Sequence, residues 1–177
     1  TEQISLSQLG SIKLDKDETK KMVTTIPRSS VLGFIIGVLP GAGSTIASFL
    51  AYGMERNFVN DDEKQKFGKG SVNGLAAPET ANNAACSGSF VPLLTLGIPG
   101  SGTTAVMLGA LLGFGIQPGP RLYQTNPEIF WSVIMSMYIG MVVLLILNLP
   151  LIPYIARILA VPRTFLIPMI LFFSVTG

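Results

Sequence analysis

Charge is distributed very unevenly along this chain. The chain has twelve basic and ten acidic residues, and 17 of these 22 lie within the first 70 positions. Three long segments carry no charge at all. A helix needs about 20 apolar residues to cross a bilayer core, and each uncharged segment is long enough. Together with a 49% hydrophobic content, this pattern predicts an all-α polytopic membrane protein. The uncharged segments are residues 29–54, 80–120 and 129–156.

Several other classes of protein are disfavoured by composition. The net charge is only +2, and no basic run is interleaved with aromatic residues, so nucleic acid is not an expected partner. The chain contains no histidine, which excludes within it a Ser-His-Asp triad or a His-Glu-x-x-His zinc site. The single cysteine, Cys86, excludes an internal disulfide and a cysteine-based metal cluster, and we predict it to be a small packing residue. We therefore expect neither an enzyme nor a cofactor.

The first uncharged segment is interrupted at its centre. Residues 1–28 and 55–70 flank it and are both rich in Lys and Arg, as cytoplasmic loops are, so a single crossing would leave its ends on the wrong sides. Pro40 and the glycines beside it disfavour a continuous helix. We predict a re-entrant hairpin over 29–54, in which Val31–Leu39 enters from the cytoplasm and Ser44–Gly53 returns. Its non-helical tip should line a cavity. Residues 1–28 are predicted to be a cytoplasmic linker with one short surface helix.

The second uncharged segment has the pattern of a broken transmembrane helix over residues 71–120. Pro78 suits a first helical position and Glu79 suits the positive end of a helix dipole, so the helix is expected to start near them. A second interruption follows from Gly97 to Thr104. The sparse later charges favour a crossing, and Pro150 and Pro153 are expected to end the returning helix. The remaining predicted segments are an outer loop (121–128), a transmembrane helix (129–153), a cytoplasmic loop (154–163) and the start of a further span (164–177).

The two interruptions share one form, Pro-Gly-small-Gly followed by hydroxyl residues, beginning at Pro40 and Pro99. Each glycine-rich turn directly precedes a helical segment, so free backbone N–H groups and the positive dipole end can bind an anion such as a carboxylate. Unwound carbonyls beside each break can hold a cation such as Na⁺. The candidate binding residues are Gly41, Gly43, Ser44, Thr45, Gly100, Ser101, Gly102, Thr103 and Thr104.

A structural alternative is that these glycines and prolines only kink or pack the helices. Small residues four apart allow close helix contact, and for the spaced glycines, Gly33, Gly37 and Gly41 or Gly109 and Gly113, this alternative is favoured. The two tips differ because proline, glycines and hydroxyls coincide twice in the middle of uncharged segments. For the tips we therefore favour a binding site.

Glu79, Asn82 and Asn83 are three and four residues apart and share one helix face. An ionisable group within or near a membrane is a functional candidate by default. A charge that only stabilises a helix start is an equally good interpretation of Glu79, and the two interpretations stay open. For the two asparagines we favour a role in binding.

Four stretches resemble one family, the large membrane subunit of the bacterial tripartite tricarboxylate transporters. They are distributed over residues 31–122, whereas Asn73 and Cys86 occupy places where the family pattern has other small or polar residues. The matching stretches are residues 37–47 (GVLPGAGSTIA), 76–85 (AAPETANNAA), 92–106 (PLLTLGIPGSGTTAV) and 115–120 (GIQPGP).

The resemblance implies a multi-pass permease of the bacterial inner membrane. It implies a small membrane subunit and a periplasmic solute-binding protein as partners, a carboxylate such as citrate as substrate, and an ion gradient of Na⁺ or H⁺ as driving force. It also implies an inverted-repeat transporter fold, of which this chain, beginning at Thr1 and ending within an apolar run, would be part. A rocking or elevator-like motion would give alternate access. A channel-like or structural membrane component, or an intramembrane enzyme, are the alternatives.

Overall fold

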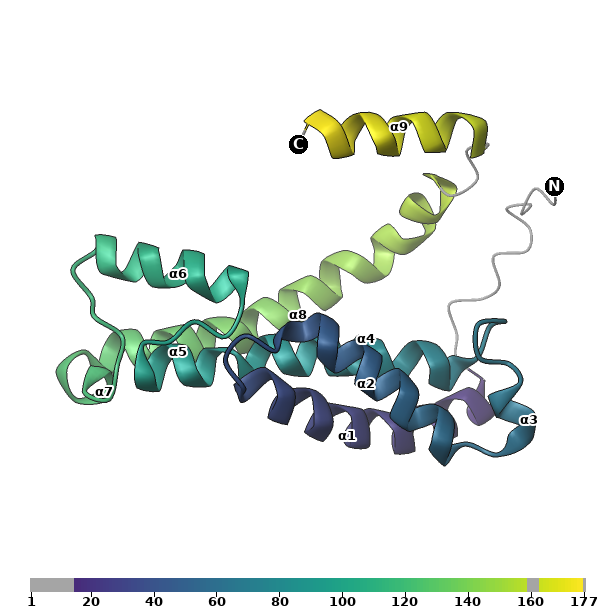
Figure 1. Ribbon diagram of the computed structural model, residues 1–177, viewed down its shortest axis with the longest axis horizontal. Helices are drawn as coiled ribbons and strands as arrows, with labels where there is room; N and C mark the ends of the chain where they lie inside the picture. The colour runs from purple at the N-terminus through teal and green to yellow at the C-terminus, as the bar shows by residue number, and fades with distance from the viewer. Residues whose placement is uncertain (1–14, 159–162, 177) are drawn as a thin grey trace. The chain divides into compact units, whose positions relative to one another are not determined.

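The computed structural model describes residues 15–158 and 163–176, and all of its regular elements are α-helices (Figure 1). No strand occurs within these ranges, which confirms the predicted all-helical class. In order, the helices are α1 (Lys16–Val38), α2 (Gly43–Phe58), α3 (Asp61–Lys64), α4 (Val72–Gly88), α5 (Phe90–Leu96), α6 (Gly102–Gly113), α7 (Leu122–Thr125), α8 (Pro127–Ile158) and α9 (Arg163–Thr176). The chain divides into two compact units, and the boundary between Met135 and Ser136 lies within the long helix α8.

Helix α1 begins much earlier than the predicted half-helix. Asp15 caps it, because its side chain accepts a hydrogen bond from the backbone N–H of Lys16 at 2.7 Å. Glu18 completes a capping box by accepting from the Asp15 N–H at 3.0 Å. The charged residues that indicated a linker are therefore the first turns of one helix, which continues through Pro27.

The turn between α1 and α2 lies at the predicted first interruption. Gly41 has φ +84° and Gly43 has φ +69°, a left-handed conformation that is favourable only for glycine. Leu39 ends α1 in an extended conformation, and the Ala42 N–H donates back to the Leu39 carbonyl at 3.2 Å. The two helices form a hairpin. Its re-entry into a membrane stays a prediction.

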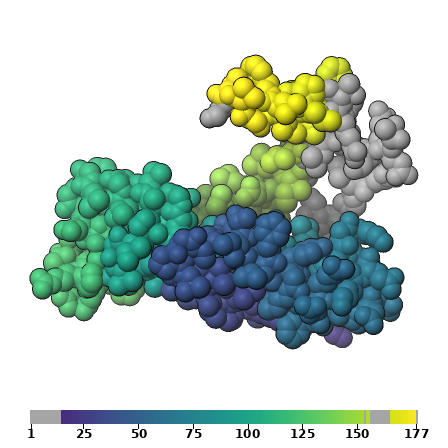
Figure 2. All heavy atoms as spheres, in the orientation of Figure 1, coloured from purple at the N-terminus to yellow at the C-terminus, as the bar shows by residue number. Residues whose placement is uncertain are grey.

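Helix α4 packs along both arms of this hairpin through small residues. A Cβ added at Gly33 would lie 2.6 Å from the Ala81 Cα, and one at Gly37 would lie 2.6 Å from the Ala85 Cα. The atoms of α1 and α2 lie side by side in the space-filling view (Figure 2). The buried residues recur every four positions: Thr25, Ser29, Gly33 and Gly37 in α1, Ala47, Ala51 and Glu55 in α2, and Asn73, Ala77, Ala81 and Ala85 in α4.

These contacts confirm the close-packing interpretation for Gly33 and Gly37 but not for Gly41, Gly109 or Gly113. Apart from the chain neighbours and the helix's own backbone, no described heavy atom lies within 4 Å of a Cβ added at these three positions. The packing also shows the relative directions of the three helices. Residue numbers increase in the same direction along the contacts between α1 and α4, so these two helices run parallel, whereas α2 runs antiparallel to both.

The predicted start of α4 near Pro78 is wrong. The Ser71 side chain caps the helix by accepting from the Gly74 N–H at 3.1 Å, so α4 begins at Val72, six residues before Pro78. Pro78 therefore lies inside the helix, where its carbonyl accepts a hydrogen bond from Ser48 Oγ of α2 at 3.2 Å. Glu79 is in the helix interior as well, so it is not a charge at a helix start.

The second predicted interruption is present between α5 and α6. Gly97 ends α5 with φ +70°, and a Cβ at this position would lie 2.7 Å from the Pro118 carbonyl oxygen. The Gly119 N–H donates to the Leu94 carbonyl at 3.3 Å, which ties the segment after α6 back to α5. Residues 98–101 are not helical.

Helix α8 is the one described helix that is long and apolar enough to cross a membrane. The qualifying stretch, Pro127–Ile152, has a mean hydropathy of 2.4 and is not buried within the structure. The prediction that Pro150 and Pro153 end this helix is wrong, since α8 continues to Ile158. Two shorter apolar stretches, Gly102–Gly113 and Phe165–Thr176, lie in α6 and α9.

Candidate functional site

The two glycine-rich interruptions, whose motifs lie 59 residues apart in the sequence, meet in space. The Gly41 N–H at the hairpin turn donates to the Gly100 carbonyl oxygen in the α5–α6 break at 3.3 Å. Gly100 is buried, and a Cβ there would lie 3.0 Å from the Ser89 Cβ. We call this meeting point the Gly41–Gly100 junction. It brings together most of the residues that the sequence singled out.

The α6 side of the junction is closed by its own hydroxyl groups. Ser101 Oγ accepts from the Thr104 N–H at 3.3 Å, and Thr104 Oγ1 accepts from the Ser101 N–H at 2.8 Å. Thr104 is only 1% exposed. These two side chains form a capping box, so their first role is to begin α6.

The α2 side is open by comparison. Ala42 occupies the N-cap position and supplies no side-chain hydrogen bond, so the first-turn N–H groups of α2 are not capped by a side chain. Thr45 and Thr103 are exposed, Ser44 is half-buried, and none of the three hydroxyls hydrogen-bonds within the described part of the chain. The N–H groups, the helix dipole and these hydroxyls can all donate toward an anion. Although their motifs match, the two tips are therefore not equivalent.

Glu79 and Asn83 lie on the side of α4 that faces away from the hairpin, opposite the packed stripe of Ala77 and Ala81, whereas Asn82 is half-buried at the flank of this stripe. Asn83 Nδ2 donates to the Glu79 carbonyl at 2.9 Å, and Asn82 Oδ1 accepts from Cys86 Sγ at 3.7 Å. Glu79, Asn83 and Cys86 are exposed in this structure. The prediction of Cys86 as a packing residue is not supported by the described contacts.

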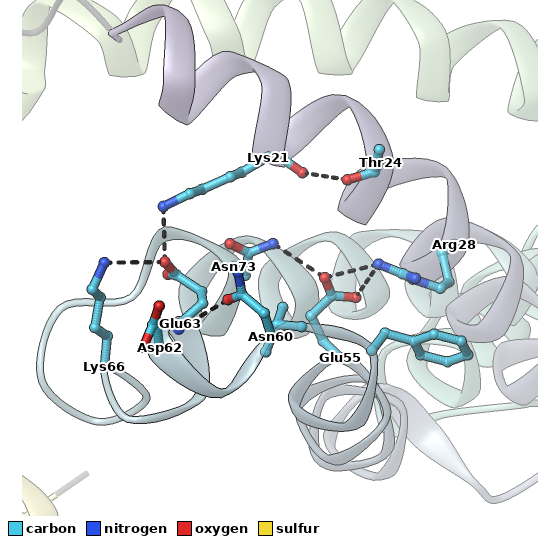
Figure 3. Close-up of a pocket in the computed structure, with 11 residues that line it drawn as sticks. Lys21, Thr24, Arg28, Glu55, Asn60, Asp62, Glu63, Lys66 and Asn73 are labelled. Atoms are coloured by element: carbon cyan, nitrogen blue, oxygen red, sulfur yellow. Dashed lines mark hydrogen bonds and ion pairs between the residues drawn. The ribbon is translucent and has the colours of Figure 1, made fainter.

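A buried charged cluster at the base of the hairpin was missed by the sequence analysis (Figure 3). Glu55 of α2 is 0% exposed. Its carboxylate accepts from Thr25 Oγ1 at 2.8 Å, from Arg28 Nη2 at 2.9 Å and from Asn73 Nδ2 at 3.2 Å. Asn73 Nδ2 also donates to Thr25 Oγ1 at 2.8 Å. We call Thr25, Arg28, Glu55 and Asn73 the Glu55 cluster, which joins α1, α2 and α4.

A pocket of about 390 Å³ adjoins this cluster. The Arg28 guanidinium lies over the Phe58 ring at 4.4 Å, and Glu63 accepts from Lys21 Nζ at 2.8 Å and from Ser71 Oγ at 2.9 Å. Basic and acidic side chains are equally represented in the lining, so the pocket offers no net charge for an anion. It is lined by Lys21, Thr24, Arg28, Glu55, Phe58, Val59, Asn60, Asp62, Glu63, Lys66 and Asn73.

The four-residue spacing of small residues could have revealed the Glu55 cluster. The glycine series at 33 and 37 extends back to Ser29 and Thr25, and the alanine series of α4 extends back to Asn73. Glu55 continues the Ala47 and Ala51 series of α2 in the same way. Because Glu55 is also the first charge after an uncharged segment, it was assigned to the loop.

Acid should weaken the base of the hairpin through Glu63. The Lys21 hydrogen bond, chiefly, and the Ser71 hydrogen bond hold the pKa of the Glu63 carboxyl below its ordinary value, although burial opposes them. A lowered pKa stabilises the fold at a pH above the ordinary carboxyl value, about 4.3. That stabilisation is lost as the pH falls through the folded-state pKa. Glu63→Gln should therefore melt below wild type at pH 7 in thermal unfolding of the detergent-solubilised protein. The difference should shrink toward pH 3.5, and a pH-independent difference would contradict this account.

The whole chain, residues 1–177, matches the model of the family described as the tripartite tricarboxylate transporter TctA family. The chain belongs to that family. The family is one of tricarboxylate transporter components, and this agrees with the membrane-length helix α8.

Two relatives of the TctA-family chain come from Agrobacterium vitis. One, described as an uncharacterized 52.8 kDa protein in the TAR-I ttuC' 3' region, is 41% identical over 175 residues, which are 99% of this chain and 34% of the relative. The other, an uncharacterized protein in the TAR-II ttuC' 3' region, is 46% identical over 145 residues, 82% of this chain and 59% of the relative. The chain thus spans about a third of the first relative's length and less than two thirds of the second relative's length. No solved structure matches it.

Proposed function

We propose that the full-length protein is the membrane permease subunit of a secondary uptake system for tricarboxylates or related carboxylates such as citrate. A small membrane subunit and a periplasmic solute-binding protein would complete the system in the bacterial inner membrane. Family membership supports the transport role. The observation that carries the site is the Gly41 to Gly100 hydrogen bond, because it unites two helix interruptions from different parts of the chain.

The substrate carboxylate binds on the α2 side of the junction in this proposal. Gly43, Ser44 and Thr45 begin a helix without a side-chain cap, so their N–H groups can bind a carboxylate without first breaking a cap. Thr103 supplies an exposed hydroxyl from α6, whereas Ser101 and Thr104 support the position of α6. Gly100 and Gly102 allow the backbone to approach closely.

A gradient of Na⁺ or H⁺ drives uptake in this proposal. Backbone carbonyls at the two breaks are suitable ligands for Na⁺, as unwound helix segments are in other transporters. Glu79 is a suitable proton or cation partner, because it lies in the interior of α4, is exposed and forms no ion pair among the described residues. Asn83 lies on the same face and Asn82 at the flank of the packed stripe, and both would contribute amide groups.

Uptake measurements separate binding hydroxyls from capping hydroxyls. Vesicles containing the full-length protein and its partners would take up labelled citrate under an imposed Na⁺ or proton gradient. Thr45→Val and Thr103→Val should raise the KM by about tenfold, since a hydrogen bond to a charged group contributes about 1.5–3 kcal/mol. Thr125→Val, which changes an exposed threonine of α7, is the matched control.

Ser101→Ala should behave differently from the two threonine variants. Loss of an N-cap costs about 1 kcal/mol, so the melting temperature should fall along with uptake. Asn83→Ala should reduce uptake with little effect on stability, because the Asn83 amide bonds only within its own helix. Unchanged KM in both threonine variants and in Asn83→Ala would place the carboxylate site elsewhere.

A further inference from the structure

One connection between the hairpin and α4 is the Glu55 cluster at the base of the hairpin. The Glu55 cluster takes one or more side chains from each of the three helices, and the Glu55 carboxylate is wholly buried. Both Glu55 oxygens lie 2.9 Å from Arg28 Nη2. If α2 moved away from α1 and α4, this charge would lose its partners, which is strongly unfavourable in a buried position.

The middle of the three helices is joined by direct backbone contact. Ala81 and Ala85 lie against the backbone at Gly33 and Gly37, leaving no room for a Cβ on either glycine. Ser48 Oγ of α2 donates to the Pro78 carbonyl of α4 at 3.2 Å. Because the helices pack this closely, α4 could slide along α1 and α2 only by breaking many short-range contacts at the same time.

Near the tip the contact continues to the end of α4. A Cβ at Gly88 would lie 2.6 Å from the Phe34 carbonyl oxygen and 3.2 Å from the Gly37 Cα. The following residue, Ser89, borders Gly100, which receives the Gly41 hydrogen bond. The hairpin turn is thus supported along the full length of α4.

Helix α6 is held much less firmly. Val106 is 76% exposed and Leu112 is 52% exposed, and among the residues of α6 only Thr104 and Leu111 are buried. Three of its glycines, Gly102, Gly109 and Gly113, have no described heavy atom within 4 Å of an added Cβ. In the described part of the chain, α6 therefore has no packing comparable to that between the hairpin and α4.

We propose that α1, α2 and α4 move as one rigid body during transport, and that the α1–α2 turn does not open as a separate gate. The surface that slides lies outside these three helices, and α6 is the nearest element free to shift against them. Glu55 is then a positioning residue, which holds the α2 side of the junction from the far end of its helix. This inference rests on the proposed transport function.

Bridging α1 to α4 tests the proposal. Thr25 bonds Asn73 and Gly33 contacts Ala81, so the buried residues Ser29 and Ala77, four positions along each helix, face each other. Ser29→Cys with Ala77→Cys, in full-length protein with Cys86→Ser and any other cysteines replaced, would be bridged by Hg²⁺. Uptake of citrate should change less than about twofold, a barrier change below about 0.4 kcal/mol.

Loss of citrate uptake on bridging, with recovery after addition of dithiothreitol, would overturn the proposal that the three helices move as one rigid body. This conclusion requires that each single-cysteine variant is unaffected by Hg²⁺. A wild-type protein that takes up no carboxylate would contradict the proposed function instead. The two failures are therefore distinguishable.

A second measurement covers the case in which the buried double variant does not fold. Spin labels attached through Val31→Cys on α1 and Leu75→Cys on α4 occupy exposed positions. Their dipolar broadening in the full-length protein should be the same with and without citrate and the driving ion. A change on addition of citrate would show that the hairpin and α4 move apart and would overturn the proposal.

Discussion

Gly37→Leu is expected to destabilise the protein by about 3 kcal/mol or more, in the upper range for overpacked cores. Any side chain at Gly37 begins 2.6 Å from the Ala85 Cα, so it meets backbone atoms that cannot rotate away. Helix α1 would have to separate from α4, and the hairpin turn would leave Gly100. Melting temperature in detergent and the yield of monodisperse protein measure the effect.

Gly113→Leu is the matched control, because it makes the same chemical change in an apolar helix. No described heavy atom lies within 4 Å of a Cβ at Gly113, and leucine favours helix more than glycine does. This variant should retain the wild-type melting temperature. If Gly37→Leu were as stable as Gly113→Leu, the close contact of α1 with α4 would be refuted.

Glu55→Leu is expected to destabilise the protein by about 3 kcal/mol, the lower end of the range for removing one partner of a buried ion pair. The lower end applies because the Arg28 side chain is 31% exposed and can reach water, while Asn73 and Thr25 lose an acceptor. Thermal unfolding of the detergent-solubilised protein measures this loss.

The double variant Arg28→Leu with Glu55→Leu isolates the charge pair. Replacement of both partners by apolar residues of similar size is often neutral, so the double variant should recover most of the stability lost by Glu55→Leu. If it were no more stable than the single variant, Glu55 would act through packing and not through its charge.

The local features of the fold follow from the sequence more readily than the tertiary ones. Pro40 and the glycines around it predicted the α1–α2 turn, and Gly97 to Gly100 predicted the α5–α6 break, because proline and left-handed glycine act on their own backbone. The start of α4 was misplaced because the Ser71 cap competes with the Pro78 signal, and proline is tolerated in the helix where α2 packs beside it.

The candidate site was predicted as a set of residues but not as an arrangement. Matching motifs indicated two equivalent tips, whereas Ser101 and Thr104 cap α6 and nothing comparable caps α2. A threonine in place of the usual Glu or Gln at the third helical position conceals the capping box. The burial of Glu55 depends on partners 27 and 18 positions away along the chain, so inspection of its neighbours alone could not reveal it.

The most direct measurement is protection of a thiol at the Gly41–Gly100 junction. Thr103→Cys in full-length protein with Cys86→Ser would be modified by a maleimide with and without citrate, and Gly113→Cys would serve as the control position. Citrate should slow modification after Thr103→Cys but not after Gly113→Cys, because a carboxylate bound at the junction covers Thr103. Equal rates after Thr103→Cys in vesicles that still take up citrate would contradict binding of the transported carboxylate at this junction.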